Sequence, residues 1–160
     1  MKLIRHFNGE ELAVYIGAHR SNNDIYSRLA YLHPAELRKE DHFTILSGTK
    51  IVAVASTQPN LYQPHILWLK QVSVDAEHRK RGYATQLVNA VFADTASRKL
   101  ALQPSSFTPL GAAYLKAVMP RLHCHYPDLA IYWNEQSRVP VSGAKPYQLD
   151  LTRQRSVQFL

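Results

Sequence analysis

The chain contains one cysteine, Cys124, among its 160 residues, so an internal disulfide is excluded. A lone thiol suits a reducing compartment, because disulfides persist mainly in oxidising ones. No continuous apolar run approaches the roughly 20 residues that are needed to cross a bilayer. The opening residues, MKLIRHFNGEEL, mix charges early and lack the apolar core of a secretory signal. These absences predict a cytoplasmic protein with no membrane partner.

Glycine is also scarce, and the glycine-rich phosphate-binding motifs are missing. A nucleotide P-loop needs Gly, four residues and then Gly-Lys-Ser/Thr, whereas Gly82 is followed by Tyr83 and Ala84. The dinucleotide fingerprint needs three glycines in GxGxxG, and this stretch has one. Zinc-finger spacing and an RNP-like aromatic string are absent as well. The net charge of +7 therefore permits a nucleic acid without favouring one over another acidic partner.

The run His123-Cys124-His125 contains potential metal ligands. No second cluster with matching spacing accompanies it in the sequence. We therefore predict no metal site.

The most informative segment is 72–96, with the sequence VSVDAEHRKRGYATQLVNAVFADTA. The residues Ile66 to Val74 overlap the start of this segment. They are rich in branched and aromatic side chains, which predicts a largely buried strand. After Gly82, the residues Ala84, Leu87, Val88 and Val91 recur at helical spacing, and Phe92 widens the apolar face. The pattern predicts a strand, a basic turn and a packed helix.

Such a turn can hold a diphosphate. The first N–H groups of a helix have no intrahelical partner, and the helix dipole adds roughly half a positive charge there. Gly82 has no side chain to hinder approach, and Arg79, Lys80 and Arg81 add full charges beside those dipoles. The alternative to a binding site is a solvated basic loop whose charges only keep the protein soluble.

The string Arg79-Lys80-Arg81-Gly82-Tyr83-Ala84 fits Arg/Gln-x-x-Gly-x-Gly/Ala after a Val-x-Val strand. In this setting it resembles the acetyl-coenzyme A signature of the GCN5-related N-acetyltransferases (GNAT superfamily). The resemblance is specific over about residues 66–118. One departure is Ala76, which stands where the family often has a proline after the strand, and this loosens the turn without removing a phosphate donor.

The resemblance implies a fold, a cofactor and its contacts. The fold is the acyl-CoA N-acyltransferase fold: α/β, with a mixed, mostly antiparallel central sheet of about seven strands and helices on both faces, here as one domain over residues 1–160. The cofactor is acetyl-CoA, whose pantetheine arm lies in a gap where the central strand splays from its neighbour. Backbone groups at Val72 and Val74 would hold that arm and the acetyl carbonyl. The diphosphate contacts would come from Arg79, Lys80, Arg81, Gly82, Tyr83, Ala84 and Thr85.

Tyr114 is the predicted catalytic residue, because many relatives have a tyrosine on this helix that gives a proton to the departing thiolate. Its helix is predicted to start at Thr108-Pro109, a capping hydroxyl followed by proline, and to end at Pro120. Leu110, Ala113, Tyr114 and Ala117 would form its buried stripe, so Tyr114 can equally be a core residue. Ser105-Ser106-Phe107 replaces an asparagine that the family often has in the preceding loop.

The general base and the acceptor are left open. Several side chains could approach an amine, namely Glu36, Asp41, His42, His65 and Gln71, and spacing does not choose among them, while Glu77 is expected to face solvent. The expected reaction is transfer of acetyl from acetyl-CoA to a primary amine of a small molecule, a protein or an aminoacyl-tRNA, nucleic acid being a partner only in the last case. The alternatives are an acyl-CoA-binding module without transfer and a basic nucleic-acid-binding protein. Exposed edge strands are compatible with a homodimer.

The remaining chain alternates between strand and helix patterns. Asn8 is predicted to cap a helix over Glu10 to His19, and Ser47-Gly48-Thr49 predicts a hairpin turn. The predicted order is β-α-α-β-β-β-α-β-α-β-β. Its elements beyond those named above are strands at Leu3 to Phe7, His42 to Leu46, Lys50 to Ser56, Lys99 to Gln103, Leu129 to Trp133 and Tyr147 to Leu151, and a helical region between Asp24 and Lys39.

Overall fold

The computed structural model describes residues 2–19, 25, 39–104, 109–133 and 147–149. The chain forms two compact units, Met1–Gln58 with Val72–Val88, and Pro59–Gln71 with Asn89–Leu160. Strand β4, Ile66–Val74, and helix α4, Tyr83–Ser97, contribute residues to both units. The single-domain assignment stays a prediction. Within the described residues, no helix is long and apolar enough to cross a membrane.

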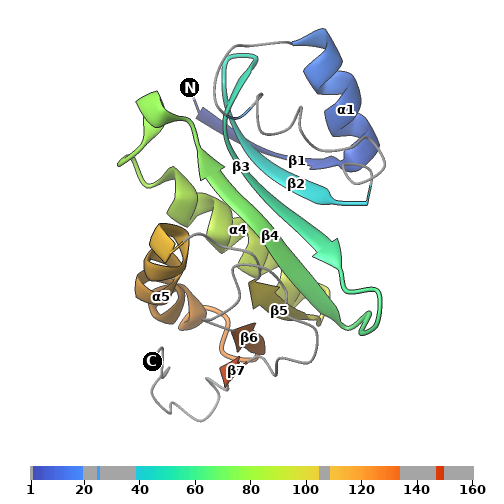
Figure 1. The fold of residues 1–160 in the computed structure, drawn as a ribbon, viewed down its shortest axis with the longest axis vertical. Helices are drawn as coiled ribbons and strands as arrows, with labels where there is room; N and C mark the ends of the chain where they lie inside the picture. Colours follow the sequence, from blue (N-terminus) through green and yellow to red (C-terminus); the bar gives the residue numbers. More distant parts are fainter. Residues whose placement is uncertain (1, 20–24, 26–38, 105–108, 134–146, 150–160) are drawn as a thin grey trace. The chain divides into compact units, whose positions relative to one another are not determined.

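The first unit contains an antiparallel sheet of β1 (Lys2–Asn8), β2 (Asp41–Ser47) and β3 (Lys50–Pro59), seen in Figure 1. The pairing of β1 with β2 runs without interruption, whereas the pairing of β2 with β3 shifts register between Ile45 and Leu46. Gly48 has φ of +63° in the β2–β3 turn, a left-handed conformation that glycine adopts without strain. The predicted hairpin is confirmed.

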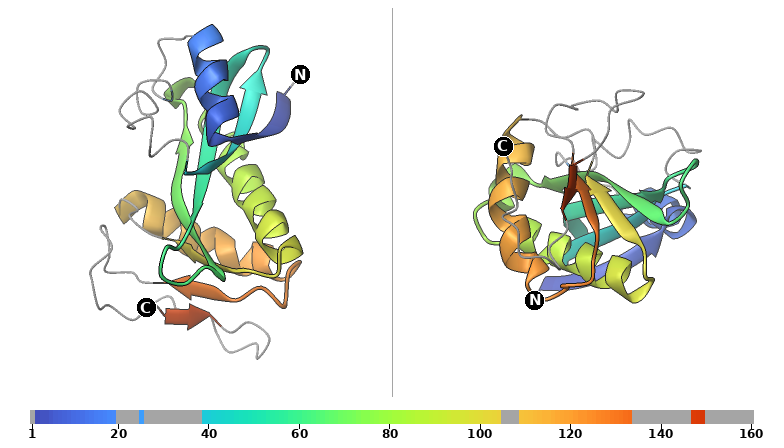
Figure 2. Two further views of the ribbon diagram at one scale, coloured as in Figure 1. Left: turned by 90° about the vertical axis from the view of Figure 1, so that its right-hand side faces the viewer. Right: turned by 90° about the horizontal axis from the view of Figure 1, so that it is seen from below.

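Helix α1 (Gly9–Ala18) lies against one face of this sheet (Figure 2). Asn8 caps it as predicted: its side chain accepts from the Glu11 amide at 2.9 Å, and the Glu11 carboxylate accepts from the Asn8 amide at 3.0 Å. This reciprocal capping box satisfies two amides that the helix cannot. Helix and sheet share one buried apolar cluster with Ile25, and its members are Phe7, Leu12, Ile25, Leu46, Ile51 and Val54.

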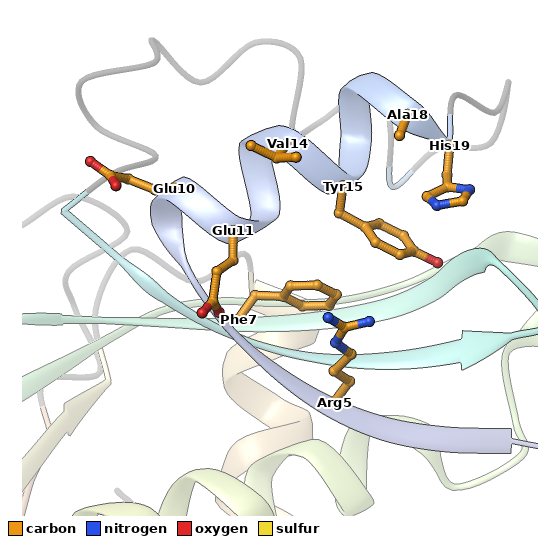
Figure 3. Close-up of a pocket in the computed structure, with 8 residues that line it drawn as sticks. All are labelled: Arg5, Phe7, Glu10, Glu11, Val14, Tyr15, Ala18 and His19. Carbon is orange, nitrogen blue, oxygen red and sulfur yellow. The ribbon is translucent and has the colours of Figure 1, made fainter.

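A shallow groove follows α1 where it passes over β1 (Figure 3). The Arg5 guanidinium lies 4.4 Å from the ring centroid of Phe7 and 5.7 Å from that of Tyr15. The Tyr15 hydroxyl donates to the carbonyl of Thr49, in the β2–β3 turn. The helix is therefore attached to the hairpin by a polar contact as well as by its apolar face.

In the second unit, β4 pairs in parallel with β5 (Ala101–Pro104), and β5 pairs in parallel with β6 (Ile131–Trp133). Strand β7 (Tyr147–Leu149) is antiparallel to β6. The β4–β5 register runs from Ile66↔Ala101 to Leu69↔Pro104. Within the described chain, β4 thus continues past the last residue of β5, so Lys70 follows the last paired position.

The apolar stripe predicted for α4 is confirmed. Leu87, Val88, Val91 and Phe92 each have 0% of their surface exposed, whereas Ala84 is half-buried. The helix begins at Tyr83, directly after Gly82, as the sequence pattern predicts.

The stripe predicted for the next helix, α5 (Pro109–His123), is wrong. Ala113 and Ala117 are exposed and Tyr114 is half-buried, while the buried side chains among those described in this helix are Leu115, Val118 and Met119. The larger side chains take the core-facing positions, because burying them removes more apolar surface from water than burying alanines. The side chain of Leu110 lies outside the described residues, as does Thr108, the predicted cap.

The predicted end of α5 at Pro120 is also wrong, although its start at Pro109 is confirmed. The helix continues through Pro120 to His123. Proline lacks one backbone donor and usually breaks or kinks a helix interior. Here three residues follow it, and Leu115, Val118 and Met119 supply the packing that keeps the last turn in place.

The predicted fold class is confirmed. The described residues contain seven strands in a mixed arrangement, with antiparallel pairs β1–β2, β2–β3 and β6–β7 and parallel pairs β4–β5 and β5–β6. Strand β5 starts two residues later than predicted, because Lys99 has φ of +55° and belongs to the preceding turn. The predicted helical region between Asp24 and Lys39 falls almost wholly outside the described residues.

Candidate functional site

The candidate site lies in the first unit, where β4 ends. The Asp75 amide donates to the Val52 carbonyl of β3 at 2.8 Å, which fixes the strand end. A short 3-10 helix, Ala76–His78, follows. Asp75 is 4% exposed, and its carboxylate Oδ2 lies 2.9 Å from Nδ1 of His78, whose amide also donates to the Asp75 carbonyl at 2.8 Å. Two contacts between the same residues hold the turn in shape.

The four residues Arg79–Gly82 are exposed. Lys80 has φ of +62° and Gly82 has φ of +79°, so the backbone is left-handed at two places around Arg81. Apart from Gly82 and its two chain neighbours, no atom of the described residues lies within 4 Å of where a Cβ on Gly82 would stand. The glycine is thus required by its backbone conformation, and the space beside it is open to a ligand.

Helix α4 opens directly at this glycine. The first intrahelical hydrogen bond runs from the Gln86 amide to the Gly82 carbonyl at 3.0 Å, so the amides of Tyr83, Ala84 and Thr85 precede the regular helical bonds. Tyr83 and Thr85 also take part in other interactions. The first turn contains no acidic residue that would neutralise the positive end of the helix dipole. The geometry therefore suits an anion.

Two of the three basic side chains are oriented by backbone carbonyls. Arg79 donates from Nε to the Val74 carbonyl at 3.2 Å, and Arg81 donates from Nη2 to the Glu77 carbonyl at 3.5 Å. The first contact uses the carbonyl of Val74, one of the two residues whose backbone groups are predicted to hold the pantetheine arm and the acetyl carbonyl.

Tyr83 is buried at 7% exposure, and its ring stacks on that of His78 with centroids 6.5 Å apart. The Asp75–His78–Tyr83 series was missed by sequence reasoning. The signal was present as Asp-x-x-His directly after a strand. The structure thus brings Val72, Val74 and Arg79–Thr85 together in the first unit, braced by side chains that were not predicted.

The predicted acid, Tyr114, lies in the second unit, on α5. It is half-buried and has interactions with its surroundings. The loop Ser105-Ser106-Phe107 lies outside the described residues. The catalytic role of Tyr114 stays a prediction.

The candidates for a general base have different surroundings. Asp41 lies 3.5 Å from His6 through Oδ1 and Nε2. His42 is fully buried, with Nδ1 2.7 Å from the Ser56 hydroxyl and Nε2 3.9 Å from a carboxylate oxygen of Glu40. The His42–Ser56 contact joins residues 14 apart, so spacing along the chain could not reveal it.

The other candidates add little to this choice. Gln71 is half-buried in the second unit, where His65 is exposed, and Glu77 is exposed as predicted. Glu36 lies outside the described residues. The geometry does not single out one base.

Cys124 lies in the run His123-Cys124-His125, which contains potential metal ligands. Its thiol is exposed and donates to the Pro120 carbonyl at 3.3 Å. In the part of the chain that the structure describes, no group of three or more His, Cys, Asp or Glu side chains is arranged to hold a metal ion.

Solved structures share this fold at low sequence identity. A predicted acetyltransferase with acetyl-CoA from Clostridium acetobutylicum gives a TM-score of 0.51 at 14% identity, over 73% of this chain and 88% of the other. A soil-metagenome aminoglycoside acetyltransferase in complex with sisomicin gives 0.53 at 14%, over 72% and 84%. The ribosomal-protein-S18-alanine N-acetyltransferase from Escherichia coli gives 0.51 at 18%, over 76% of each chain.

A comparison with curated protein sequences gives no match. The family model described as acetyltransferase (GNAT) family matches residues 10–105, which include β4, the basic turn and all of α4. The family model thus includes the string Arg79–Ala84 and covers more than half of the chain. The chain belongs to the GNAT family of acetyltransferases and is an enzyme of the acyltransferase class.

Proposed function

We propose that this enzyme transfers the acetyl group of acetyl-CoA to a primary amine, in the cytoplasm. The observation that carries the proposal is the exposed turn Arg79–Gly82, whose left-handed glycine opens helix α4. An anion placed there meets backbone amides, an unneutralised helix dipole and three basic side chains.

The residues present fit the two ends of this cofactor. Arg79, Lys80, Arg81 and the amides from Arg81 to Thr85 would hold the diphosphate, and the open space beside Gly82 admits it. Val72 and Val74 are half-buried at the end of β4, where their backbone groups would hold the pantetheine arm and the acetyl carbonyl.

When bound, the cofactor supplies an acetyl thioester. The amine must be neutral to attack the carbonyl carbon, so that a C–N bond forms as the C–S bond breaks. A backbone donor at the end of β4 would polarise the acetyl oxygen. The Tyr114 hydroxyl would hold the proton that the departing thiolate sulfur takes up, and the excess amine proton leaves to a base or to water.

The acceptor is a small molecule, a protein amine or an aminoacyl-tRNA. Fold neighbours include an aminoglycoside acetyltransferase and an enzyme for the alanine of ribosomal protein S18. These two acceptors differ in size and charge, so the fold by itself leaves all three classes open.

Thermal unfolding with and without acetyl-CoA, together with thiol release on a panel of amines, tests the proposal. Acetyl-CoA at about 100 times its Kd should stabilise the protein by about 2.7 kcal/mol, because it binds the folded state alone. Thiol release should then depend on the added amine. Absence of any stabilisation, combined with binding of DNA or RNA that falls steeply with salt, would contradict it.

A further inference from the structure

We propose that the groove along α1 is a self-complementary interface, which binds α1 of a second copy of this chain running in the opposite direction. The inference concerns assembly, so it goes beyond the proposed function and does not depend on it. All the residues that line the groove belong to the first unit.

The outer face of α1 has an apolar centre between charged ends. The helix residues that line the groove are Glu10, Glu11, Val14, Tyr15, Ala18 and His19. They form two rows whose members are four residues apart, so both rows lie on the same face of the helix. Val14, at the centre, is 74% exposed, whereas Leu12 on the opposite side is fully buried. Figure 3 shows the two glutamates at one end of the groove and His19 at the other.

The floor of the groove is held in place before any partner binds. The ring of Tyr15 has its centroid 5.1 Å from that of Phe7, which is buried, and 4.4 Å from that of His19. The Arg5 guanidinium lies over both Phe7 and Tyr15, and the Tyr15 hydroxyl donates to the Thr49 carbonyl. A surface that is already shaped loses less conformational freedom when a partner binds.

The spacing of the lining residues is symmetric about the point between Val14 and Tyr15. The pairs of positions that share this midpoint are Glu10 with His19, Glu11 with Ala18, and Val14 with Tyr15. A second α1 placed antiparallel about this point puts Val14 opposite the partner's Tyr15 and Glu10 opposite the partner's His19. Each contact then occurs twice, as a two-fold interface requires.

Charge complementarity favours a second copy as the occupant. The acidic end of one groove meets the basic end of the other, where Arg5 adds a permanent charge beside His19. The apolar side chain of Val14 is covered between these ends, which gives the interface an apolar centre and a polar rim. A partner of another sequence would have to carry this reversed pattern, whereas a second copy of the chain already has it.

Sedimentation velocity of the full chain over a concentration series at low salt tests the inference. The average mass of the wild type should rise with concentration from that of one chain towards twice that value. Val14→Glu should weaken self-association about 100-fold, because it places two carboxylates in the apolar centre. Leu61→Glu is the matched control, since Leu61 is 73% exposed but lies in the second unit, and it should change nothing.

A charge exchange tests the antiparallel arrangement. Glu10→Lys and His19→Glu should each weaken self-association about 10-fold, because the attraction is lost at both ends of the interface. The double variant should regain it, and an equimolar mixture of the two single variants should form a mixed dimer, since opposite charges face each other again. Glu10 is exchanged in preference to Glu11, whose carboxylate is part of the capping box.

A wild type that stays monomeric at the highest soluble concentration overturns the inference, and the groove is then a solvated face or the site of a different protein. Self-association that Val14→Glu leaves unchanged also overturns it, because the copies then meet elsewhere. The same holds if neither the double variant nor the mixture regains the dimer. Stabilisation of the wild type by acetyl-CoA tests the proposed function separately, whatever the oligomeric state.

Discussion

The buried carboxylate of Asp75 lies 2.9 Å from Nδ1 of His78, across the short helix that leads into the basic turn. His78 is stacked in turn on Tyr83, the first residue of α4. The strand end and the helix start are thus connected through side chains as well as through the exposed backbone between them. This connection supports the turn through side chains and leaves the backbone of the exposed residues Arg79–Gly82 accessible.

Replacing Asp75 with alanine should destabilise the protein by about 1–3 kcal/mol, since a buried hydrogen-bonding partner is lost. The same change should reduce the stabilisation by acetyl-CoA, because the turn is less well defined. Thermal unfolding with and without the cofactor measures both effects. Glu77→Ala, at an exposed residue of the short helix that follows Asp75, is the control and should change neither.

Gly82→Ala should destabilise the protein by about 1–2 kcal/mol, because a Cβ disfavours the left-handed backbone at this residue. It should also weaken cofactor binding, since the new methyl group occupies the space beside the helix start. Gly17→Ala is the matched control, at an exposed glycine in α1, and should be stabilising by about 0.5–1 kcal/mol. If both variants bind acetyl-CoA as the wild type does, the diphosphate does not bind at Gly82.

Tyr114→Phe should lower turnover by about 100-fold, at the lower end of what a positioned general acid contributes. The stabilisation by acetyl-CoA should change little, because the proposed contacts to the diphosphate and the pantetheine arm do not involve the phenol. Steady-state thiol release and thermal unfolding give the two readouts. Tyr132→Phe, at a half-buried tyrosine of β6, is the control for loss of a hydroxyl. Full turnover in Tyr114→Phe would remove the proposed acid.

Leu115→Ala should cost about 2–5 kcal/mol in the free energy of unfolding, since it leaves a cavity in the core. Ala117→Ser, two residues later on the exposed side of α5, should stay within about 0.5 kcal/mol. Denaturant unfolding of both variants distinguishes the observed stripe from the one that spacing predicted. A larger loss of stability from Ala117→Ser than from Leu115→Ala would instead support the predicted stripe, which includes Ala117.

The sequence predicted β4, the basic turn and α4 well, because each has a strong local signal. Ile66–Val74 matches the predicted strand at both ends, and Gly82 has the positive φ that a tight turn before a helix requires. In α5 the signal is ambiguous, since alanines and large apolar residues alternate and more than one stripe has helical spacing. Tertiary packing determines that Leu115, Val118 and Met119 are buried, and helical spacing alone does not distinguish this stripe from the predicted one.

Contacts between distant parts of the chain were beyond sequence reasoning. The pairing of His42 with Ser56 depends on the register of β2 against β3, which shifts at Ile45. The Trp68–Gln103 contact depends likewise on the parallel register of β4 and β5. One residue of slip would turn either partner to the opposite face.

The hydroxyl of Tyr15 and the carbonyl of Thr49 are separated by 34 residues of sequence. A ten-residue helix such as α1 is too short to persist alone in water, where isolated helices below about 12–15 residues are marginal. The helix is therefore stabilised by its contacts with the hairpin, among them the hydrogen bond from Tyr15 to Thr49. A peptide cut from the amino-terminal end of this enzyme would remain a coil, and this helix and the hairpin would melt cooperatively.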